Sequence, residues 1–326
     1  MDHSIQSVST LAAIWLGVSI AVGLALAIIT SLQQSIRDYF SFWKLESKKL
    51  QDVGYLAPKP GKIETAITRS LFKIKGYIEC CKITIIGREN LPTGRTIIAG
   101  NHIDIGDTDV ISEIVGRKAG RFLIALPEVP PEKPEGILMA MAGAIPVDQL
   151  SKRAKVTVIS TAADALIDDG PDALLAIFPQ GQLDPNEEIT LESFKRGTAE
   201  IARRAAERLK PNETIWIVPL GIHYKNDELK VPLLNRHFKH MMNKLMPPRR
   251  DGSPFFSVAK YEAIGVIGEP IAVTSQRLST QLPEDNALAT KFLHAAVKSA
   301  HNKALDYSIK HEFKSLDQEL AGCTRE

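Results

Sequence analysis

The chain has 326 residues, of which 44% are hydrophobic and 24% are charged. This is the composition of an ordinary globular protein, long enough for one large domain or two small ones. The formal net charge is only +2 and no aromatic RNA-binding pattern occurs, so we expect no nucleic acid partner. The cysteines at positions 80, 81 and 323 lack metal-ligand spacing and favour a reducing compartment over a disulfide framework.

The first 36 residues predict a transmembrane anchor helix. Residues 9–32 carry no charged side chain, and about 20 apolar residues are enough to cross the hydrocarbon core of a bilayer. The start of the chain lacks the basic segment of a signal peptide, whereas a helix buried in the protein is the alternative because Gly17 and Gly23 dilute the run. The run is followed by Arg37, Lys44, Lys48 and Lys49. By the positive-inside rule we therefore expect a membrane protein with a single N-terminal span and the rest of the chain in the cytoplasm.

Residues 37–80 predict an amphipathic helical neck. Prolines at positions 58 and 60 divide it, and beyond them apolar residues recur three or four positions apart, as on one face of a helix. This stripe consists of Ile63, Ile67, Leu71, Ile74 and Ile78. Basic side chains lie among these residues, so the helix could rest on anionic headgroups. The alternative is that it packs on the rest of the protein.

From residue 82 the sequence alternates between short apolar runs and longer helical patterns. Strands are expected at residues 82–87, 96–100, 121–126, 144–148, 173–179, 214–224 and 259–271, and helices at 108–119, 136–143, 154–170 and 194–209. This alternation is typical of an α/β fold, a sheet sandwich with helices on both faces. Residues 235–250 interleave basic and large apolar side chains and predict a further helix, either interfacial or solvated. We expect one α/β domain over residues 81–275 and a helical C-terminal extension over residues 276–326.

One histidine and three aspartates follow the second predicted strand, and they allow three hypotheses. The residues are His102, Asp104, Asp107 and Asp109. In the first hypothesis, Asp107 at the start of a helix folds back onto His102, selects its tautomer and makes it a general base. In the second, all four residues bind a metal through N and O ligands. In the third, His102 has no chemical role and the remaining aspartates stabilise the helix start.

The residues around His102 resemble the first sequence block of the glycerolipid acyltransferase superfamily, which includes lysophosphatidic acid acyltransferases. The run ITIIGRENLPTGRTIIAGNHIDIGD ends in the family's N-H-x-x-x-x-D pattern, here Asn101, His102 and Asp107. The later blocks are similar, in order, to GAIPVDQ (143–149), FPQGQL (178–183) with FKRGTAEIA (194–202) after it, WIVPLGI (216–222) and IGEPI (267–271). The likeness thus extends over roughly residues 80–272, and five ordered blocks are far more specific than the histidine motif alone.

The resemblance implies a glycerol-phosphate acyltransferase-like fold and an O-acyltransferase that moves a fatty acyl group from acyl-CoA or acyl carrier protein to a lipid hydroxyl. Since no G-x-S-x-G nucleophile element is present, His102 is implied to take the proton directly from the substrate hydroxyl, with Asp107 orienting it. Membrane lipids are the implied partners. The acyl thioester is a co-substrate, and neither a metal nor a further cofactor is implied. The oligomeric state is left open.

The same resemblance implies a set of substrate-binding residues. They are Asn101, Gly143, Pro146, Gln149, Phe178, Pro179, Gln180, Gly181, Lys195, Gly197 and Pro219. Among them, the turn at residues 178–181 is expected to stabilise the oxyanion, because a glycine turn can present backbone N–H groups without an obstructing side chain.

Three positions depart from the family pattern and bear on the acceptor. The family has Arg, Glu and Arg where this chain has Gln149, Gln180 and Leu183. Because a guanidinium fork suits phosphate, the loss of two arginines favours a neutral or glycosylated lipid alcohol, or a lysolipid with another headgroup. Nearby basic residues that could replace them are Lys152, Arg153, Lys195 and Arg196. Two other functions stay open: a non-catalytic lipid-binding relative and a metal-dependent hydrolase.

Overall fold

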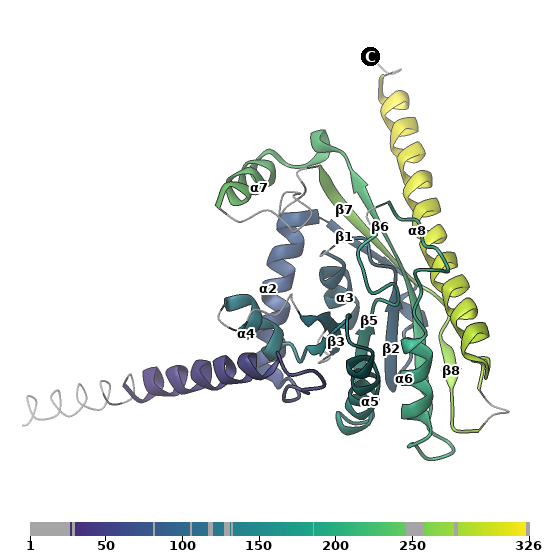
Figure 1. Ribbon diagram of the computed structural model, residues 1–326. Coiled ribbons are helices and arrows are strands. Elements are labelled where there is room, and N and C mark those ends of the chain that lie inside the picture. Colours follow the sequence, from purple (N-terminus) through teal and green to yellow (C-terminus); the bar gives the residue numbers. More distant parts are fainter. Residues whose placement is uncertain are drawn as a thin grey trace, which may run out of the picture.

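The computed structural model describes residues 27, 30–80, 82–104, 106–116, 120–126, 131, 133–184, 186–245, 257, 259–276 and 280–323. These residues form a central sheet with helices on both of its faces (Figure 1). The strands are β1 (Lys82–Ile86), β2 (Arg95–Gly100), β3 (Arg121–Ala125), β4 (Ile145–Val147), β5 (Leu174–Ile177), β6 (Ile215–Asn226), β7 (Lys260–Ile267) and β8 (Ile271–Val273). The strand order is β1-β7-β6-β2-β5-β3-β4, with β8 paired to β6.

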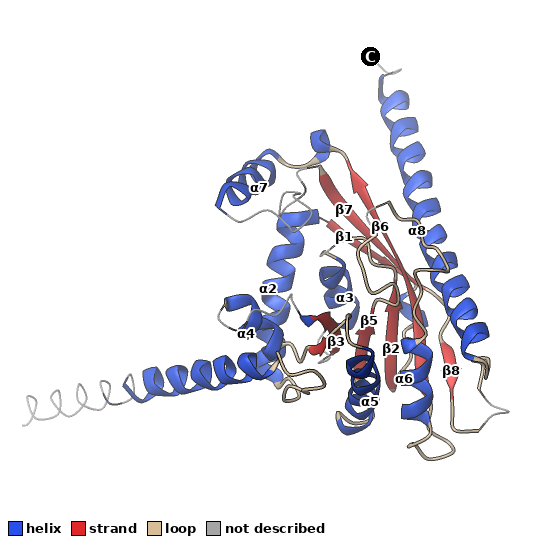
Figure 2. Ribbon diagram, in the orientation of Figure 1, coloured by secondary structure: helices blue, strands red, loops and turns tan. Residues whose placement is uncertain are grey.

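Most neighbouring strands are parallel, as the alternating sequence pattern predicts. The exceptions are β7 and β8, which both run antiparallel to β6. The helices are α2 (Lys62–Cys80), α3 (Asp107–Val115), α4 (Pro134–Met141), α5 (Lys152–Asp168), α6 (Gly197–Ala206), α7 (Leu233–Leu245) and α8 (Asn286–Cys323), with short 3₁₀ turns η1 (Arg88–Asn90) and η3 (Glu228–Lys230). The predicted α/β sheet with helices on both faces is therefore confirmed (Figure 2).

Each central strand sends alternate side chains into two separate cores. On one face Ile97 of β2 and Ile217 of β6 pack with α5, α6 and α8. On the other face Ile98 and Leu220 pack with Val110 of α3. All of these side chains are fully buried or nearly so, and each such aliphatic side chain contributes about 1.5–3 kcal/mol to stability. The central strands are thereby covered on both sides, which positions their ends precisely.

The last predicted strand is divided in two, which corrects the sequence prediction of one strand over 259–271. β7 pairs with the second half of β6 and β8 with its first half. The interruption lies beside Pro219, which has no N–H to donate to a neighbouring strand. Instead the Gly268 N–H donates to the Pro219 carbonyl at 2.8 Å. Pro270 follows two residues later and also lacks an N–H donor, so the strand pairing starts again only at Ile271.

The predicted membrane anchor lies almost entirely outside the described residues. Its last part begins a helix that covers residues 30–49 and projects from the α/β body (Figure 1). Within the described part of the chain, no helix is both long enough and apolar enough to cross a membrane.

The helix predicted from the basic and apolar residues 235–250 corresponds to α7 as far as Leu245, and residues 246–250 lie outside the described residues. One of its basic residues, Lys239, is fully buried and donates to the Lys260 carbonyl at 2.7 Å. Asn235 donates to the Tyr77 carbonyl at 3.1 Å and so joins α7 to α2. The side of α7 that carries these two residues therefore packs against the protein rather than facing solvent or headgroups.

Candidate active site

The histidine predicted as a general base lies where a central parallel strand ends and a helix begins. β2 ends at Gly100, α3 starts at Asp107, and His102 lies in the connection between them. The carboxyl ends of parallel strands are the usual place for a site in an open α/β sheet, because the chain leaves the sheet there and side chains from several connections meet.

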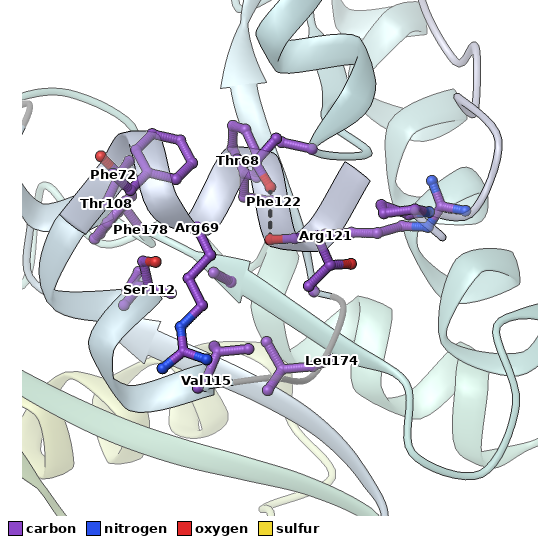
Figure 3. A pocket seen from close by; sticks show the side chains of 17 residues that line it. Thr68, Arg69, Phe72, Thr108, Ser112, Val115, Arg121, Phe122, Leu174 and Phe178 are labelled. Atoms are coloured by element: carbon purple, nitrogen blue, oxygen red, sulfur yellow. Dashed lines mark hydrogen bonds between the residues drawn. The ribbon is translucent and has the colours of Figure 1, made fainter. Parts of the chain in front are cut away.

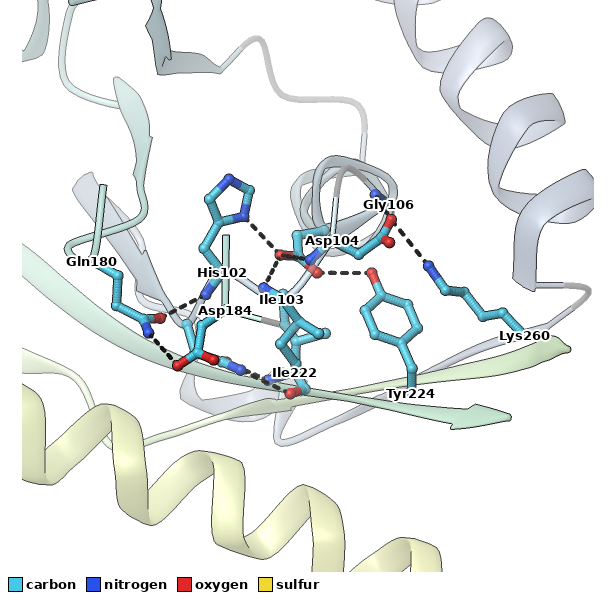
Figure 4. Close-up of polar contacts among 11 residues, drawn as sticks. His102, Ile103, Asp104, Gly106, Gln180, Asp184, Ile222, Tyr224 and Lys260 are labelled. Carbon is cyan, nitrogen blue, oxygen red and sulfur yellow. Dashed lines mark hydrogen bonds and ion pairs between the residues drawn. The ribbon is translucent and has the colours of Figure 1, made fainter. Parts of the chain in front are cut away.

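His102 and Asp107 form the predicted pair. His102 Nδ1 lies 2.8 Å from Asp107 Oδ2. The same oxygen accepts hydrogen bonds from the backbone N–H groups of Ile103 at 2.7 Å and Asp104 at 3.1 Å, and Oδ1 accepts one from the Tyr224 hydroxyl at 2.8 Å (Figure 4). Asp107 is fully buried, whereas the His102 side chain is 21% exposed. The carboxylate is thus held rigidly by four donors.

This arrangement selects one tautomer of His102. A carboxylate held by donors can only accept, so the proton of the neutral imidazole lies on Nδ1. The other ring nitrogen, Nε2, then carries a lone pair and points away from the contacts around Asp107 (Figure 4). A partly exposed imidazole in this state can take a proton from a bound hydroxyl, and the buried carboxylate stabilises the imidazolium that results.

The segment after β5 holds His102 from a second side. The Gln180 side-chain carbonyl accepts the His102 N–H at 2.9 Å, and the Asp184 N–H donates to the His102 carbonyl at 2.7 Å. The Gln180 amide in turn donates to the Asp184 carboxylate at 3.3 Å (Figure 4). The Phe178 ring stacks on the imidazole with a centroid distance of 4.1 Å and an interplanar angle of 8°. Backbone and ring of His102 are therefore both fixed by residues 178–184.

Sequence reasoning missed two residues that support this site. The first is Tyr224, a positioning residue whose hydroxyl holds Asp107. The second is Lys260, whose ammonium pairs with Asp104 at 3.0 Å and lies 4.1 Å from the centre of the Tyr224 ring. The alternation of β6 could have placed Tyr224 on the same face as Leu220, but no local signal connects Lys260 with the connection after β2.

Asn101 and Gly181, two of the predicted substrate-binding residues, form hydrogen bonds with other parts of the protein. The buried Asn101 amide exchanges two hydrogen bonds with the backbone of Ile222, at 2.7 and 3.0 Å. This joins the end of β2 to β6. Gly181 has a φ of 68°, a left-handed conformation that favours glycine. Its N–H, predicted as an oxyanion donor, closes the turn onto the Phe178 carbonyl at 2.9 Å.

The remaining predicted residues divide into those at the turn and those away from it. Gln149 reaches the turn, because its amide donates to the Gly181 carbonyl at 2.7 Å. Lys195 borders it, since its N–H donates to the Pro179 carbonyl at 2.9 Å. The other four residues lie within the fold. Gly143 (φ 72°) packs against Pro60, Pro146 is buried in β4, Gly197 begins α6 and Pro219 lies within β6.

The alternative metal site built on the aspartates after β2 is not assembled. Asp104 pairs with Lys260, and Asp109 in the first turn of α3 pairs with Lys75 at 2.8 Å. Each of these carboxylates is thus neutralised by a lysine instead of converging with His102 on a common point. The position of Asp109 agrees with the interpretation of a carboxylate that stabilises a helix start.

The chain is similar to a protein family and to a solved structure. Residues 82–223 match the family model described as Acyltransferase. No curated protein matches the chain. Among solved structures, the chain is similar to the crystal structure of the 1-acyl-sn-glycerophosphate (LPA) acyltransferase PlsC from Thermotoga maritima. The TM-score is 0.46 and the identity 16%, over 75% of this chain and 79% of that one.

Proposed function

We propose that this protein, an acyltransferase whose residues 82–223 belong to the Acyltransferase family, transfers a fatty acyl group from acyl-CoA or acyl carrier protein to the hydroxyl of a lipid. The family match confirms the resemblance seen in the sequence blocks. The observation that carries the proposal is the pair of His102 and Asp107, because it supplies the one element that a thioester and an alcohol lack, a base at the hydroxyl.

The proposed reaction needs one proton shuttle. His102 Nε2 takes the proton of the acceptor hydroxyl while that oxygen attacks the thioester carbonyl. The tetrahedral intermediate then expels the thiolate, the ester bond remains, and the imidazolium returns its proton to the thiolate. Asp107 stays ionised throughout and stabilises the imidazolium. No side-chain nucleophile takes part, so the acyl group passes directly from sulfur to oxygen.

An apolar pocket beside His102 supports a long acyl chain as the transferred group. It lies between α2, α3 and the sheet, is open to solvent on one side, and is lined mainly by apolar side chains (Figure 3). Those walls include Phe72, Ile111, Val115, Phe122, Leu174 and Phe178. Phe178 also stacks on the His102 ring. A chain seated in this pocket would therefore end with its carbonyl near the proposed base.

The pocket predicts that Ser112→Phe shortens the preferred acyl chain. Ser112 lines the pocket from α3 (Figure 3) and is partly exposed, so a larger side chain can fill the pocket without entering a core. We expect the ratio of kcat/KM for palmitoyl over octanoyl donors to fall at least about tenfold, because even one methylene in an apolar pocket carries about 1–3 kcal/mol. Ser112→Ala is the matched control. An unchanged ratio in Ser112→Phe would place the acyl chain elsewhere.

Helix α2 supports an approach of substrate from a lipid surface. Thr65, Thr68 and Phe72 on one side of the helix line the pocket. The predicted stripe lies on the opposite side, and four of its members are exposed, namely Ile63, Ile67, Leu71 and Ile74. Exposed apolar residues along a helix suit insertion among headgroups. We propose that α2 lies on the membrane, so that an acyl chain reaches the pocket past this helix, and that the catalytic domain is cytoplasmic.

The altered motif positions support a proposal about the chemical class of the acceptor lipid. The Gln149 amide donates a hydrogen bond to the Gly181 carbonyl. Gln180 is 1% exposed, and its side chain is hydrogen-bonded to the His102 N–H and to the Asp184 carboxylate. Neither position offers the guanidinium fork that suits a phosphate group. Exposed cations near this turn, among the described residues, include Lys195 and Arg196, which lie just before α6. We therefore propose a lipid alcohol whose recognition does not depend on a phosphate held by the second and third motifs.

The proposal is tested by acyl transfer in detergent with the full chain. Thiol release from acyl-CoA and from acyl carrier protein is followed with monoacylglycerol, lysophosphatidic acid or a lysolipid of another headgroup as acceptor. The expected result is labelled product with one donor class and at least one acceptor. Turnover that needs lysophosphatidic acid would contradict the acceptor proposal. No transfer with either donor would favour a non-catalytic lipid-binding protein.

A further inference from the structure

Three side chains outside the acyl-transfer site converge on one point. Glu187 Oε2 lies 2.8 Å from His223 Nδ1 and 2.8 Å from His301 Nε2. One ligand atom from each residue lies within 4.8 Å of those from the other two. His301 is buried, and His223 and Glu187 are largely buried. The three residues, called the EHH cluster below, come from a loop, a central strand and the C-terminal helix.

The fold brings these elements together closely. On β6, Tyr224 faces Asp107, so the preceding residue His223 points to the opposite face, which α8 covers. The backbone of α8 passes directly against Gly221, where a Cβ would overlap Ala300 and His301. Glu187 reaches the same place from the loop before α6, with a φ of 58° that is uncommon for a residue other than glycine.

We propose that the EHH cluster binds a divalent transition-metal ion, with zinc the expected ion. Two imidazoles and one carboxylate are the ligand set that nitrogen- and oxygen-binding metals such as zinc use when one coordination position stays open to water. The ligand atoms already lie close enough together for a small rearrangement to place them around one ion.

The Glu187 carboxylate lies between the two imidazoles and contacts both. Burial alone raises the pKa of Glu187, but the hydrogen bonds and charges of His223 and His301 outweigh it and lower that pKa to about 2. A histidine binds a metal through the lone pair of a neutral ring nitrogen, and each of the two imidazoles here has such a nitrogen next to the carboxylate.

The metal would link three parts of the fold instead of taking part in acyl transfer. The cluster lies on the α8 side of β6, whereas Asp107 and Tyr224 meet on the other side. The Glu187 N–H donates to the Asp184 carbonyl, and the Asp184 N–H donates to the His102 carbonyl. A metal at the EHH cluster would therefore fasten the loop that holds His102 to both β6 and α8. This role is separate from the proposed function and does not depend on it.

The experiment is reconstitution of the full chain, purified in detergent and stripped with chelator, with Zn²⁺ and with Co²⁺. The expected result is about one bound Zn²⁺ per chain, visible-region absorption of four- or five-coordinate Co²⁺ that Zn²⁺ displaces, and a higher Tm with Zn²⁺ than with chelator. His301→Gln and Glu187→Gln should each weaken Zn²⁺ binding by more than the roughly 10–100-fold that loss of a supporting residue costs.

The matched control is His294→Gln. His294 lies on the same helix, and its Nε2 contacts the Ile189 carbonyl outside the cluster, so this variant should bind Zn²⁺ as the wild type does. A wild-type chain that gives no Co²⁺ absorption and no Zn²⁺-dependent Tm would overturn the proposal and leave a hydrogen-bonded triad. Equal Zn²⁺ binding by the wild type, His301→Gln and Glu187→Gln would also overturn it, because the ion would then lie elsewhere. Neither result would alter the acyl-transfer assay.

Discussion

His102→Ala should lower kcat/KM for acyl transfer by roughly 10²–10⁴-fold, the usual contribution of a general base. The remaining site keeps its pocket and its held carboxylate, so substrates still bind, but the hydroxyl has no group to take its proton. The loss should appear mainly in kcat. Thiol release and labelled lipid product measure it, with the Tm of the variant as a check that the fold is retained.

Two further variants accompany His102→Ala: Asp107→Asn, which should also lose activity, and His237→Ala, which should keep it. The Asp107→Asn side chain can donate a hydrogen bond to Nδ1 and thereby leaves the proton on Nε2, so we expect a loss of similar size without removal of the imidazole. His237 is exposed on α7, and its Nδ1 lies 2.9 Å from the Leu233 carbonyl, so His237→Ala should keep full activity. If His102→Ala kept more than about a tenth of wild-type activity, His102 would not be the base.

Gly221→Ala should destabilise the protein by at least about 3 kcal/mol, at the upper end of the cost of overfilling a core. A Cβ at this position overlaps the backbone of Ala300 and His301, and helix backbone cannot move aside as a flexible side chain can. The helix α8 must therefore shift away from β6 and take Val297 and Ala304 out of their contacts. The apparent Tm should fall by roughly 5–10 °C.

Gly197→Ala is the matched control for that substitution. Gly197 is the first residue of α6, and a Cβ there meets no atom within 4 Å. Alanine is the better helix former, so this change should leave stability equal or raise it by up to about 1 kcal/mol. Equal Tm values for the two variants would show that α8 does not pack on β6 as closely as the structure has it.

Local sequence patterns predicted the elements because secondary structure depends on short-range periodicity. The residue spacing on β2 and α3 predicted a strand, a tight connection and a helix start, and the five-residue separation of His102 and Asp107 was enough to predict their contact. The position at which a strand is interrupted was harder to predict. The division between β7 and β8 depends on Pro219, which lies about fifty positions earlier and removes a donor from the facing strand.

The hydrogen-bond partners of individual side chains could not be predicted from the sequence. Asn101 and Gln180 were predicted to bind substrate, yet their amides hold β6 and the backbone of His102. A motif shows which residue type stands at a position, but the partner of its side chain is chosen by whatever the fold brings near. Buried amides then bond within the protein, because an unpaired polar group in the interior costs about 1–3 kcal/mol.

The sequence by itself determined the α/β class, the resemblance to acyltransferases over part of the chain and the pair of His102 and Asp107, since each of these is expressed in residues close along the chain. Only the tertiary structure decided that Tyr224 completes the support of Asp107 from 117 positions away. It also decided that Glu187 meets His223 and His301 across separations of 36 and 114 residues. Such contacts leave no periodic trace in the sequence, because strand order and helix docking, rather than local spacing, bring the side chains together.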